Sequence, residues 1–421
     1  MKKYIVLLSL ILTISITMIP AAYAQEFGLV VNQYVQAGGN DGGNADTSFE
    51  YNALIVPRFL FLLGDGAGSI FASAGMTLGV SDSSDDDVTF VPELMRTELA
   101  MQWGAVGLSL GRIGYSTPLA FLAEGLFDGV QVSHSSSLGR FRAGAWYTGL
   151  LYKKSANIQM TENDRAIYYT PFDFDNFADT YFAPPRLLAS LDWEHLAVAD
   201  ILRLNAAVTM QADLSDDLSS NGEKYNSQYF TIKAGMPYNS FFFELGGILS
   251  TFQIEGEGSF KPAFAGDIGV YWTLPASLNS RLSFNARFAS GQSSDASGDG
   301  AGGFIPVTAK YAGNILEAGM SALTVLDLNY TARFTDKIGA SISTKYFIQN
   351  GSTPLNTYPF SGAVGGGDSL GAELFARLIW SPVSDLQLNL SGGAFIPALG
   401  NYAPDAKPVW LVKLTAVFVA Y

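Results

Sequence analysis

Two histidines are the imidazole groups that this sequence of 421 residues offers for general acid–base catalysis. His134 stands among four serines, Ser133 and residues 135–137. A serine beside a histidine is the arrangement that activates a hydroxyl for nucleophilic attack. A Ser–His hydrolase is therefore one hypothesis, to be tested against the positions that the fold gives these side chains.

Metal and thiol chemistry have little support. The chain has no cysteine, which excludes a disulfide framework, a zinc–thiolate site and a cysteine nucleophile, and two histidines do not make a multi-histidine centre. The glycine- and acid-rich stretches 40–46 and 295–303 lack the alternate-position ligands and the closing glutamate of an EF-hand loop. We expect no metal and no cofactor.

The residues around these positions alternate with a period of two. From 202 to 213, mostly apolar residues at even positions alternate with mostly polar residues, including Arg203, at odd positions. The same split runs through residues 281–288, 337–346 and 386–391. Strict alternation predicts β-strands with one apolar and one polar face.

The composition is apolar, at 48% hydrophobic residues and 15% charged residues. No stretch after residue 24 approaches the roughly 20 apolar residues of a membrane-spanning helix. The candidate strands are about 10 to 15 residues long, whereas globular strands usually have about five or six. A transmembrane β-barrel accounts for both observations.

The N-terminus has the pattern of a cleaved signal peptide at residues 1–24. Lys2 and Lys3 precede an apolar run over residues 5–19, and Ala22 and Ala24 supply a small-x-small cleavage pattern. The remaining chain, 25–421, is predicted to be one barrel domain. Removal of the signal peptide would make the net charge of −14 still more negative. A strongly negative chain argues against nucleic acid as a partner.

Eighteen candidate strands can be counted, with sixteen as the alternative. They cover residues 26–37, 47–63, 67–80, 88–102, 104–115, 127–136, 138–152, 184–195, 200–213, 224–235, 238–254, 260–274, 279–291, 315–333, 337–349, 369–381, 385–398 and 408–421. Arg112 shares parity with apolar neighbours, so either Gly111 marks a bulge or the strand ends there.

The connections alternate between short and long. Short turns, such as 64–66 and 381–384, would face the periplasm, and long loops, such as 153–183 and 292–314, would face the outside. The fold class is therefore predicted to be all-β, a closed antiparallel transmembrane barrel in the outer membrane of a diderm bacterium, with membrane lipid around it. The terminal Tyr421 resembles the C-terminal signature that barrel-assembly machinery recognises.

Basic residues recur on the polar parity of these strands. A cation on the lipid-facing side costs about 2–4 kcal/mol at the midplane, so these side chains are predicted to line the interior. The predicted basic ladder is Arg112, Arg140, Arg142, Arg186, Arg203, Lys233, Arg281, Arg287, Arg333, Lys345 and Arg377. Acidic residues share the polar parity, including Glu244, Asp267 and Glu373, so an internally paired ladder is the alternative.

The loop 153–183 is the best candidate for a constriction. Its notable residues are one arginine and several aromatics, Arg165, Tyr168, Tyr169, Phe172, Phe174, Phe177 and Tyr181. Folded into the lumen, they would offer flat apolar surfaces flanked by polar groups, which suits sugars and other amphipathic solutes. A self-packed extracellular cap is the alternative. Residues 116–127 are predicted to form a short, buried helical turn.

One local resemblance is present. Residues 108–113, then Pro118, then 127–130 resemble the Gly-Arg strand and the following Asp-Gly strand of the alginate-export family of eighteen-stranded outer-membrane barrels. The resemblance implies an electropositive conduit for an anionic polysaccharide, with Arg112 as the matched basic position. Ile113 stands where that family usually has glutamine.

These patterns favour a porin-like channel over an enzyme. A barrel of 16 to 18 strands encloses an aqueous lumen, so passive diffusion of small hydrophilic solutes is expected, with anionic and carbohydrate-type solutes as candidates. Both histidines fall near the short-turn rim, away from the loops that would build an external active site. A surface adhesin or host-interaction barrel is the alternative, an outer-membrane enzyme is a weaker one, and the oligomeric state stays open.

Overall fold

The computed structural model describes residues 26–40, 47–64, 67–81, 88–215, 224–254, 260–275, 279–291, 303–351, 360 and 366–420. The predicted signal peptide, the terminal Tyr421 and most acidic loop residues, including Asp85–Asp87 and Asp295, lie outside these ranges. Within them, no helix is both long and apolar enough to cross a membrane.

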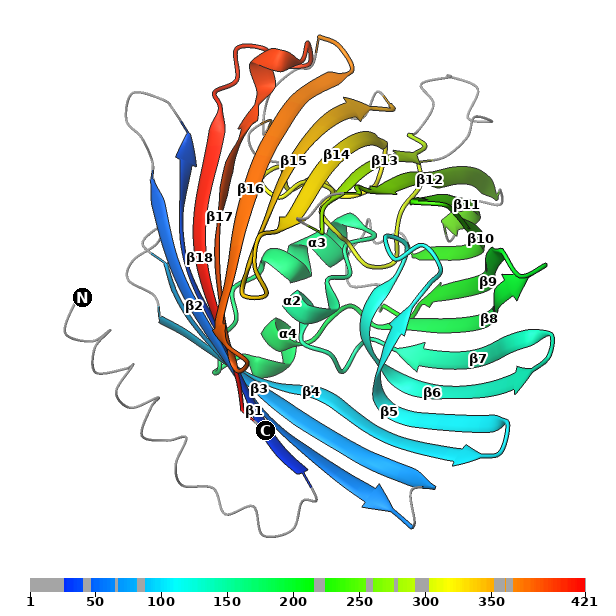
Figure 1. The fold of residues 1–421 in the computed structure, drawn as a ribbon. Helices are drawn as coiled ribbons and strands as arrows, with labels where there is room; N and C mark the ends of the chain where they lie inside the picture. The colour runs from blue at the N-terminus through cyan, green and yellow to red at the C-terminus, as the bar shows by residue number, and fades with distance from the viewer. Residues whose placement is uncertain are drawn as a thin grey trace.

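Eighteen antiparallel strands form one closed sheet (Figure 1). The strands are β1 (Glu26–Asn40), β2 (Ser48–Leu63), β3 (Gly68–Ser81), β4 (Val88–Trp103), β5 (Val106–Ser116), β6 (Glu124–Ser136), β7 (Gly139–Tyr147), β8 (Arg186–Val198), β9 (Leu202–Asp213), β10 (Tyr225–Tyr238), β11 (Phe241–Ile254), β12 (Lys261–Thr273), β13 (Arg281–Ala289), β14 (Leu323–Arg333), β15 (Ile338–Gln349), β16 (Ser369–Val383), β17 (Leu386–Ile396) and β18 (Val409–Ala420). Each strand pairs with its neighbours in the chain, and β1 also pairs with β18. The prediction of an all-β, eighteen-stranded antiparallel barrel is confirmed, and sixteen strands is excluded.

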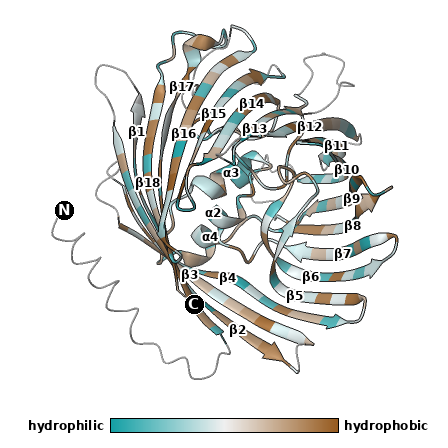
Figure 2. Cartoon of the chain, in the orientation of Figure 1, coloured by the Kyte–Doolittle hydropathy of each residue, from teal (hydrophilic) through white to brown (hydrophobic). Residues whose placement is uncertain are grey.

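Alternation along the strands gives the barrel an apolar outer face. On β16, Leu374, Leu378 and Trp380 are each between 44% and 49% exposed, whereas Glu373 and Phe375 of the opposite parity are buried. Bands of opposite hydropathy follow one another along most strands (Figure 2). This outer face suits lipid, because the backbone hydrogen bonds of a closed barrel are satisfied between strands.

The short turns join even-numbered strands to the next strand, so they lie at one rim. Examples are the turns between β4 and β5 and between β16 and β17. Both described ends of the chain, Glu26 and Ala420, lie at this rim because β1 leaves it and β18 returns to it.

Four strand predictions were wrong by three or more residues at their loop ends. The strand predicted over 138–152 ends at Tyr147, the one predicted over 315–333 begins at Leu323, the one predicted from 127 begins at Glu124, and the one predicted over 26–37 ends at Asn40. In the first two cases residues with strand-like composition belong to loops that pack inside the barrel, where burial rather than pairing selects apolar residues.

Three short helices lie inside the ring of strands (Figure 1). They are α2 (Lys153–Ala156), α3 (Glu162–Tyr169) and α4 (Phe177–Tyr181), and a 3-10 turn, η1 (Pro397–Leu399), follows β17. The helical turn predicted within 116–127 was wrong. Leu119 and Leu122 are buried as expected, at 2% and 0% exposure, but the segment between β5 and β6 is an irregular turn.

Candidate functional site

The β5–β6 hairpin leaves the barrel wall part-way along its length. Pairing of β4 with β5 stops at Thr97↔Arg112, and pairing of β6 with β7 stops at Asp128↔Tyr147. The two strands of the hairpin stay paired with each other as far as Ser116↔Glu124. Residues 113–127 therefore project from the wall into the barrel.

Two glycines stand opposite each other at this departure point, since Gly111 pairs with Gly129. Gly111 has a φ of +117°, and a Cβ there would overlap the carbonyl oxygen of Thr97. At Gly129 a Cβ would overlap the carbonyl oxygen of Ala145. Glycine tolerates both the backbone angle and the close approach. Both predicted alternatives, a bulge at Gly111 and a strand end there, were wrong: β5 continues to Ser116, and its pairings with β4 and β6 show no register shift at Gly111.

Arg112 and Asp128 fill the gap that the hairpin leaves. Nε and Nη2 of Arg112 donate to Oδ1 and Oδ2 of Asp128, each at 2.8 Å. Nη2 also donates to the Leu150 carbonyl at 3.0 Å, and Nη1 donates to the Leu94 carbonyl of β4. Arg112 is 5% exposed, so it seals the junction of wall and hairpin and does not line a water-filled lumen.

The loop between β7 and β8 is anchored inside the barrel by a buried ion pair. Thr161 and Asp164 form a capping box at the start of α3. Nη2 of Arg186 donates to both oxygens of Asp164, at 2.7 and 2.6 Å, and Nη1 pairs with Asp213 of β9. Arg186 and Asp164 are both 0% exposed. Arg186 is thus an anchor for α3, under the loop.

The segment 303–322 crosses the interior from β13 to β14. Tyr229 of β10 donates to the Ile305 carbonyl at 2.7 Å. Further along, the amide of Val307 donates to the Leu122 carbonyl, and the amide of Ala309 to the Asn157 carbonyl, both at 2.8 Å. The segment therefore touches the wall, the hairpin tip and the α2 loop in turn. We call residues 113–127, 148–185 and 303–322 the inward segments.

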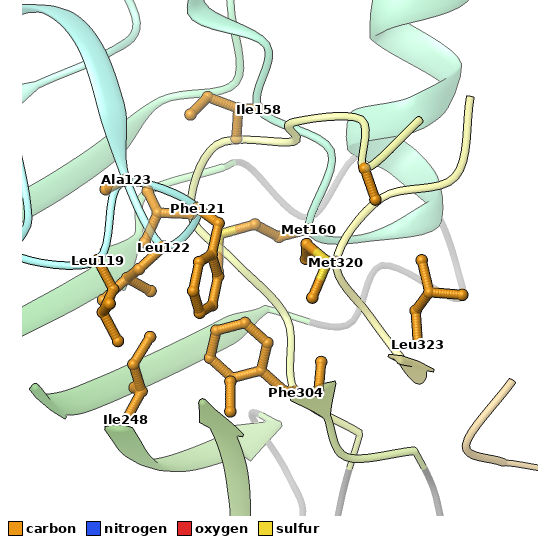
Figure 3. Packing of buried hydrophobic residues seen from close by; sticks show 14 of the residues in the cluster. Leu119, Phe121, Leu122, Ala123, Ile158, Met160, Ile248, Phe304, Met320 and Leu323 are labelled. Atoms are coloured by element: carbon orange, nitrogen blue, oxygen red, sulfur yellow. The ribbon is translucent and has the colours of Figure 1, made fainter. Parts of the chain in front are cut away.

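The inward segments share one apolar core. Leu119 and Phe121 of the hairpin tip, Met160 of the α2–α3 loop, and Phe304 and Met320 of the third segment are all buried, and they pack together within the barrel (Figure 3). The Phe121 and Phe304 ring centroids are 6.2 Å apart. A packed apolar core therefore fills part of the barrel interior. The sequence had predicted only an aqueous lumen.

The eleven predicted ladder residues fall into three groups. Arg112, Arg186 and Lys345 bind the inward segments or seal their junction with the wall. Lys233 pairs with Glu244 at 2.9 Å, Arg287 with Asp267 at 3.7 Å, and Arg333 with Asp336 at 3.9 Å in a turn. The third group forms no ion pair within the described parts of the chain and comprises Arg140, Arg142, Arg203, Arg281 and Arg377.

Aromatic contacts hold two members of the third group. The guanidinium of Arg203 lies 5.7 Å from the ring centroid of Phe242, and that of Arg281 lies 5.4 Å from the centroid of Tyr271. Phe242, Tyr271 and Arg281 line a depression of about 570 Å³ near the short-turn rim. These contacts fix the cations without neutralising them.

The aromatic residues of the predicted constriction loop form two groups. Phe172, Phe174, Phe177 and Tyr181 contact one another around α4, and Phe174 also stacks on Phe90 of β4. Tyr168 and Tyr169 lie beneath Lys154, whose Nζ is 3.8 and 5.3 Å from the two ring centroids. Arg165 is exposed on α3.

The histidines lie toward the short-turn rim. His134 is exposed near the end of β6, and His195 accepts a hydrogen bond on Nδ1 from the Ala197 amide at 3.2 Å. In the chain as described, no group of three or more histidine, aspartate or glutamate side chains could hold a metal ion.

Sequence reasoning missed several anchoring residues. Asp164 could have been found, because Thr161 and Asp164 have capping-box spacing. No motif in the sequence predicted the contact of Lys154 with the tyrosines of α3. The alternation of polar residues placed Glu373 on the inner face but did not predict that it binds backbone amides. These roles depend on contacts between segments that are distant in the sequence.

No family model matches the sequence, and no curated protein matches it. Solved structures do. OccK2 (OpdF) of Pseudomonas aeruginosa aligns with a TM-score of 0.60 at 11% identity, over 94% of this chain and 97% of that chain. OccK5 (OpdH) aligns with a TM-score of 0.57 at 10% identity, over 95% and 99%.

A third similar structure is the outer membrane protein OpdK of the same organism, with a TM-score of 0.57 at 11% identity, over 94% of this chain and 100% of that chain. The fold is that of an outer-membrane porin. At identities of 10 to 11% the likeness shows the barrel architecture alone.

Proposed function

We propose that this protein is an outer-membrane channel for passive diffusion of small hydrophilic solutes, with a preference for anions such as carboxylates. The observation that carries the proposal is the imbalance of free charge on the inner face. Arg140, Arg142 and Arg377 face inward with no carboxylate within ion-pair distance in the described structure, although Glu194 and Asp192 stand opposite Arg140 and Arg142 in the strand register. Several inner carboxylates, by contrast, are bound as anchors.

The anchoring carboxylates are Asp128 on Arg112, Asp164 and Asp213 on Arg186, and Glu373 on backbone amides. Asp164, Asp213 and Glu373 are buried and Asp128 is bonded to Arg112, so a permeating ion does not contact these carboxylates directly. Fixed cations in a partly desolvated lumen act on a passing ion more strongly than surface charges, which are screened within about 8 Å at physiological salt.

The similar structures agree with a carboxylate preference. OpdK has been crystallised with vanillate and OccK2 with glucuronate, and both ligands carry one carboxylate. Two further observations favour a channel over an adhesin. The loop 148–185 and the segment 303–322 both contribute residues to the apolar core inside the barrel, so they are not displayed at its surface. We further propose that the protein resides in the outer membrane, with lipid around it, and is inserted by the barrel-assembly machinery.

The test is the reversal potential of the refolded protein in planar bilayers under a salt gradient. The wild type should prefer anions despite its net charge of −14. Replacing Arg140, Arg142, Arg281 and Arg377 with glutamine should move the permeability ratio toward cations, and neutralising Asp85, Asp86 and Asp87 should change it little. A cation-selective wild type, or the opposite ordering of the two variants, would refute the basic-lumen proposal.

A further inference from the structure

Three charged residues stand side by side on the inner face of β14, β15 and β16. Asp327 pairs in register with Lys345, and Lys345 pairs with Glu373. A row of alternating charges on adjacent strands would ordinarily be interpreted as a cross-strand ion-pair network. Here Lys345 and Glu373 bind the backbone of the third inward segment instead.

The Glu373 carboxylate receives a set of convergent donors. Its oxygens accept hydrogen bonds from the amides of Asn314 at 2.9 and 3.1 Å, Ile315 at 2.9 Å and Leu316 at 3.1 Å. The side-chain amide of Asn314 adds a fourth donor at 2.8 Å. Successive backbone amides that converge in this way form an anion-binding concavity, and Glu373, 1% exposed, occupies it.

Lys345 binds the same stretch with the opposite polarity. Its Nζ donates to the Ala312 carbonyl at 2.7 Å. The cation therefore holds an acceptor and the anion holds donors within five consecutive residues, 312–316. Charge-assisted hydrogen bonds are roughly twice as strong as neutral ones, so the two side chains specify one backbone position for the stretch.

The residues on either side of this stretch face the other elements of the interior. Tyr311 lies close enough to Tyr168 and Tyr169 of α3 for their hydroxyl groups to interact electrostatically. Glu317 interacts electrostatically with Lys154 of α2 and with Glu50 of β2. The position of 312–316 therefore sets where Tyr311 and Glu317 stand relative to the β2 wall.

We propose that Glu373 and Lys345 form a latch that holds residues 311–317 across the barrel and so sets the width of the permeation path. They are positioning residues, which act through the backbone that they bind. The inference rests on the proposed channel function, because a permeation path must exist for its width to be set. The contact between the latch and residues 311–317 can be tested without measuring conduction.

The chain offers a second way to break the latch, from the loop side. A Cβ added to Gly313 would lie 2.8 Å from Oε2 of Glu373 and 2.5 Å from the Leu316 carbonyl oxygen, closer than side-chain atoms pack. Gly319, in the same segment, has no atom within 4 Å of an added Cβ. Gly313→Ala and Gly319→Ala are therefore a matched test and control.

The experiment compares Glu373→Gln, Glu373→Leu, Gly313→Ala and Gly319→Ala with the wild type in planar bilayers, after each variant has shown the mobility shift of a folded barrel. Glu373→Leu and Gly313→Ala should each raise single-channel conductance at least about 1.5-fold or add open-channel noise. Glu373→Gln should fall between, and Gly319→Ala should match the wild type. The double variant Glu373→Leu/Gly313→Ala should equal either single variant, because both break one contact.

A second readout does not need conduction. Ala318 is 3% exposed, so a cysteine there should react slowly with a maleimide in the wild-type background and at least tenfold faster with Glu373→Leu or Gly313→Ala. Unchanged labelling and unchanged conductance in a folded Glu373→Leu barrel would overturn the latch. A wild type that does not conduct, together with the labelling change, would refute the channel proposal and leave the latch standing.

Discussion

Arg112 and Asp128 form a two-point ion pair at the last register position before the β5–β6 hairpin leaves the barrel wall. The pair is placed where two strands lose their outer neighbours at once. The remaining guanidinium donors of Arg112 bind carbonyls on either side, those of Leu94 and Leu150. One side chain thus joins the hairpin, β4 and the start of the inward loop.

Breaking this pair on one side should destabilise the barrel. Arg112→Met leaves Asp128 partly buried without its partner, and Asp128→Asn removes the charge that Arg112 needs, so each should lower the free energy of unfolding by about 3 kcal/mol. The measurement is a urea titration of the folded barrel in detergent. As a control, Asp336→Asn in the exposed turn with Arg333 should leave the midpoint unchanged, and an equal loss there would contradict the assignment.

The glycine at the same junction should tolerate no side chain. Gly111→Ala must place a Cβ against the Thr97 carbonyl at a φ of +117°, which should cost at least about 2 kcal/mol. Gly114, three residues along the same strand, has no atom within 4 Å of an added Cβ. Folding yields from denaturant should therefore fall for Gly111→Ala and stay level for Gly114→Ala; equal yields would show that the glycine is not required.

The wall of the barrel could be predicted from the sequence because its physics is local. Alternation on adjacent residues gives each strand its faces, and all eighteen strands were located, as residues 202–213 and 386–396 illustrate. The inward segments could not be predicted in the same way. Residues 148–152 and 315–322 have the apolar composition of strands, yet their buried members, such as Leu151 and Leu316, pack against other segments.

The site shows the same limit. Parity placed Arg186 and Lys345 on the inner face, which is where they lie, but it could not distinguish a cation open to the lumen from one that anchors a loop. Asp164 and Ala312, their respective partners, are distant in the sequence. Such contacts follow from the path of a loop, which carries no periodic signal.

Anion preference should increase at mildly acidic pH. Desolvation and the nearby Glu50 carboxylate raise the pKa of the Glu317 carboxyl, while Lys154 lowers it. With a raised pKa, Glu317 takes up a proton at higher pH than an ordinary glutamate and loses its negative charge as the pH falls. Reversal potentials at pH 7 and pH 5 should show the shift, and Glu317→Gln should remove most of it; a full shift in that variant would assign the effect to other groups.

The two rims should differ in access from outside the cell. Asp405, between β17 and β18, is exposed at the long-loop rim, and Ser384, between β16 and β17, is exposed in a short turn. A cysteine at Asp405 should react with an impermeant maleimide on intact cells, and one at Ser384 should react only after lysis. Labelling of Ser384 alone on intact cells would mean that the barrel is inserted the other way up.

The pairing of β1 with β18 has a consequence for assembly. Because the first strand is joined to the last, the cylinder cannot be completed until the whole chain is present, and until then both strands are open edges that invite wrong partners. Residues 113–127, 148–185 and 303–322 each join an odd-numbered strand to the next strand, so they enter the interior from the long-loop rim, at the opposite end of the barrel from Glu26 and Ala420. Closure of the wall is therefore the step that waits for β18, whereas the interior is filled by segments that come earlier in the chain.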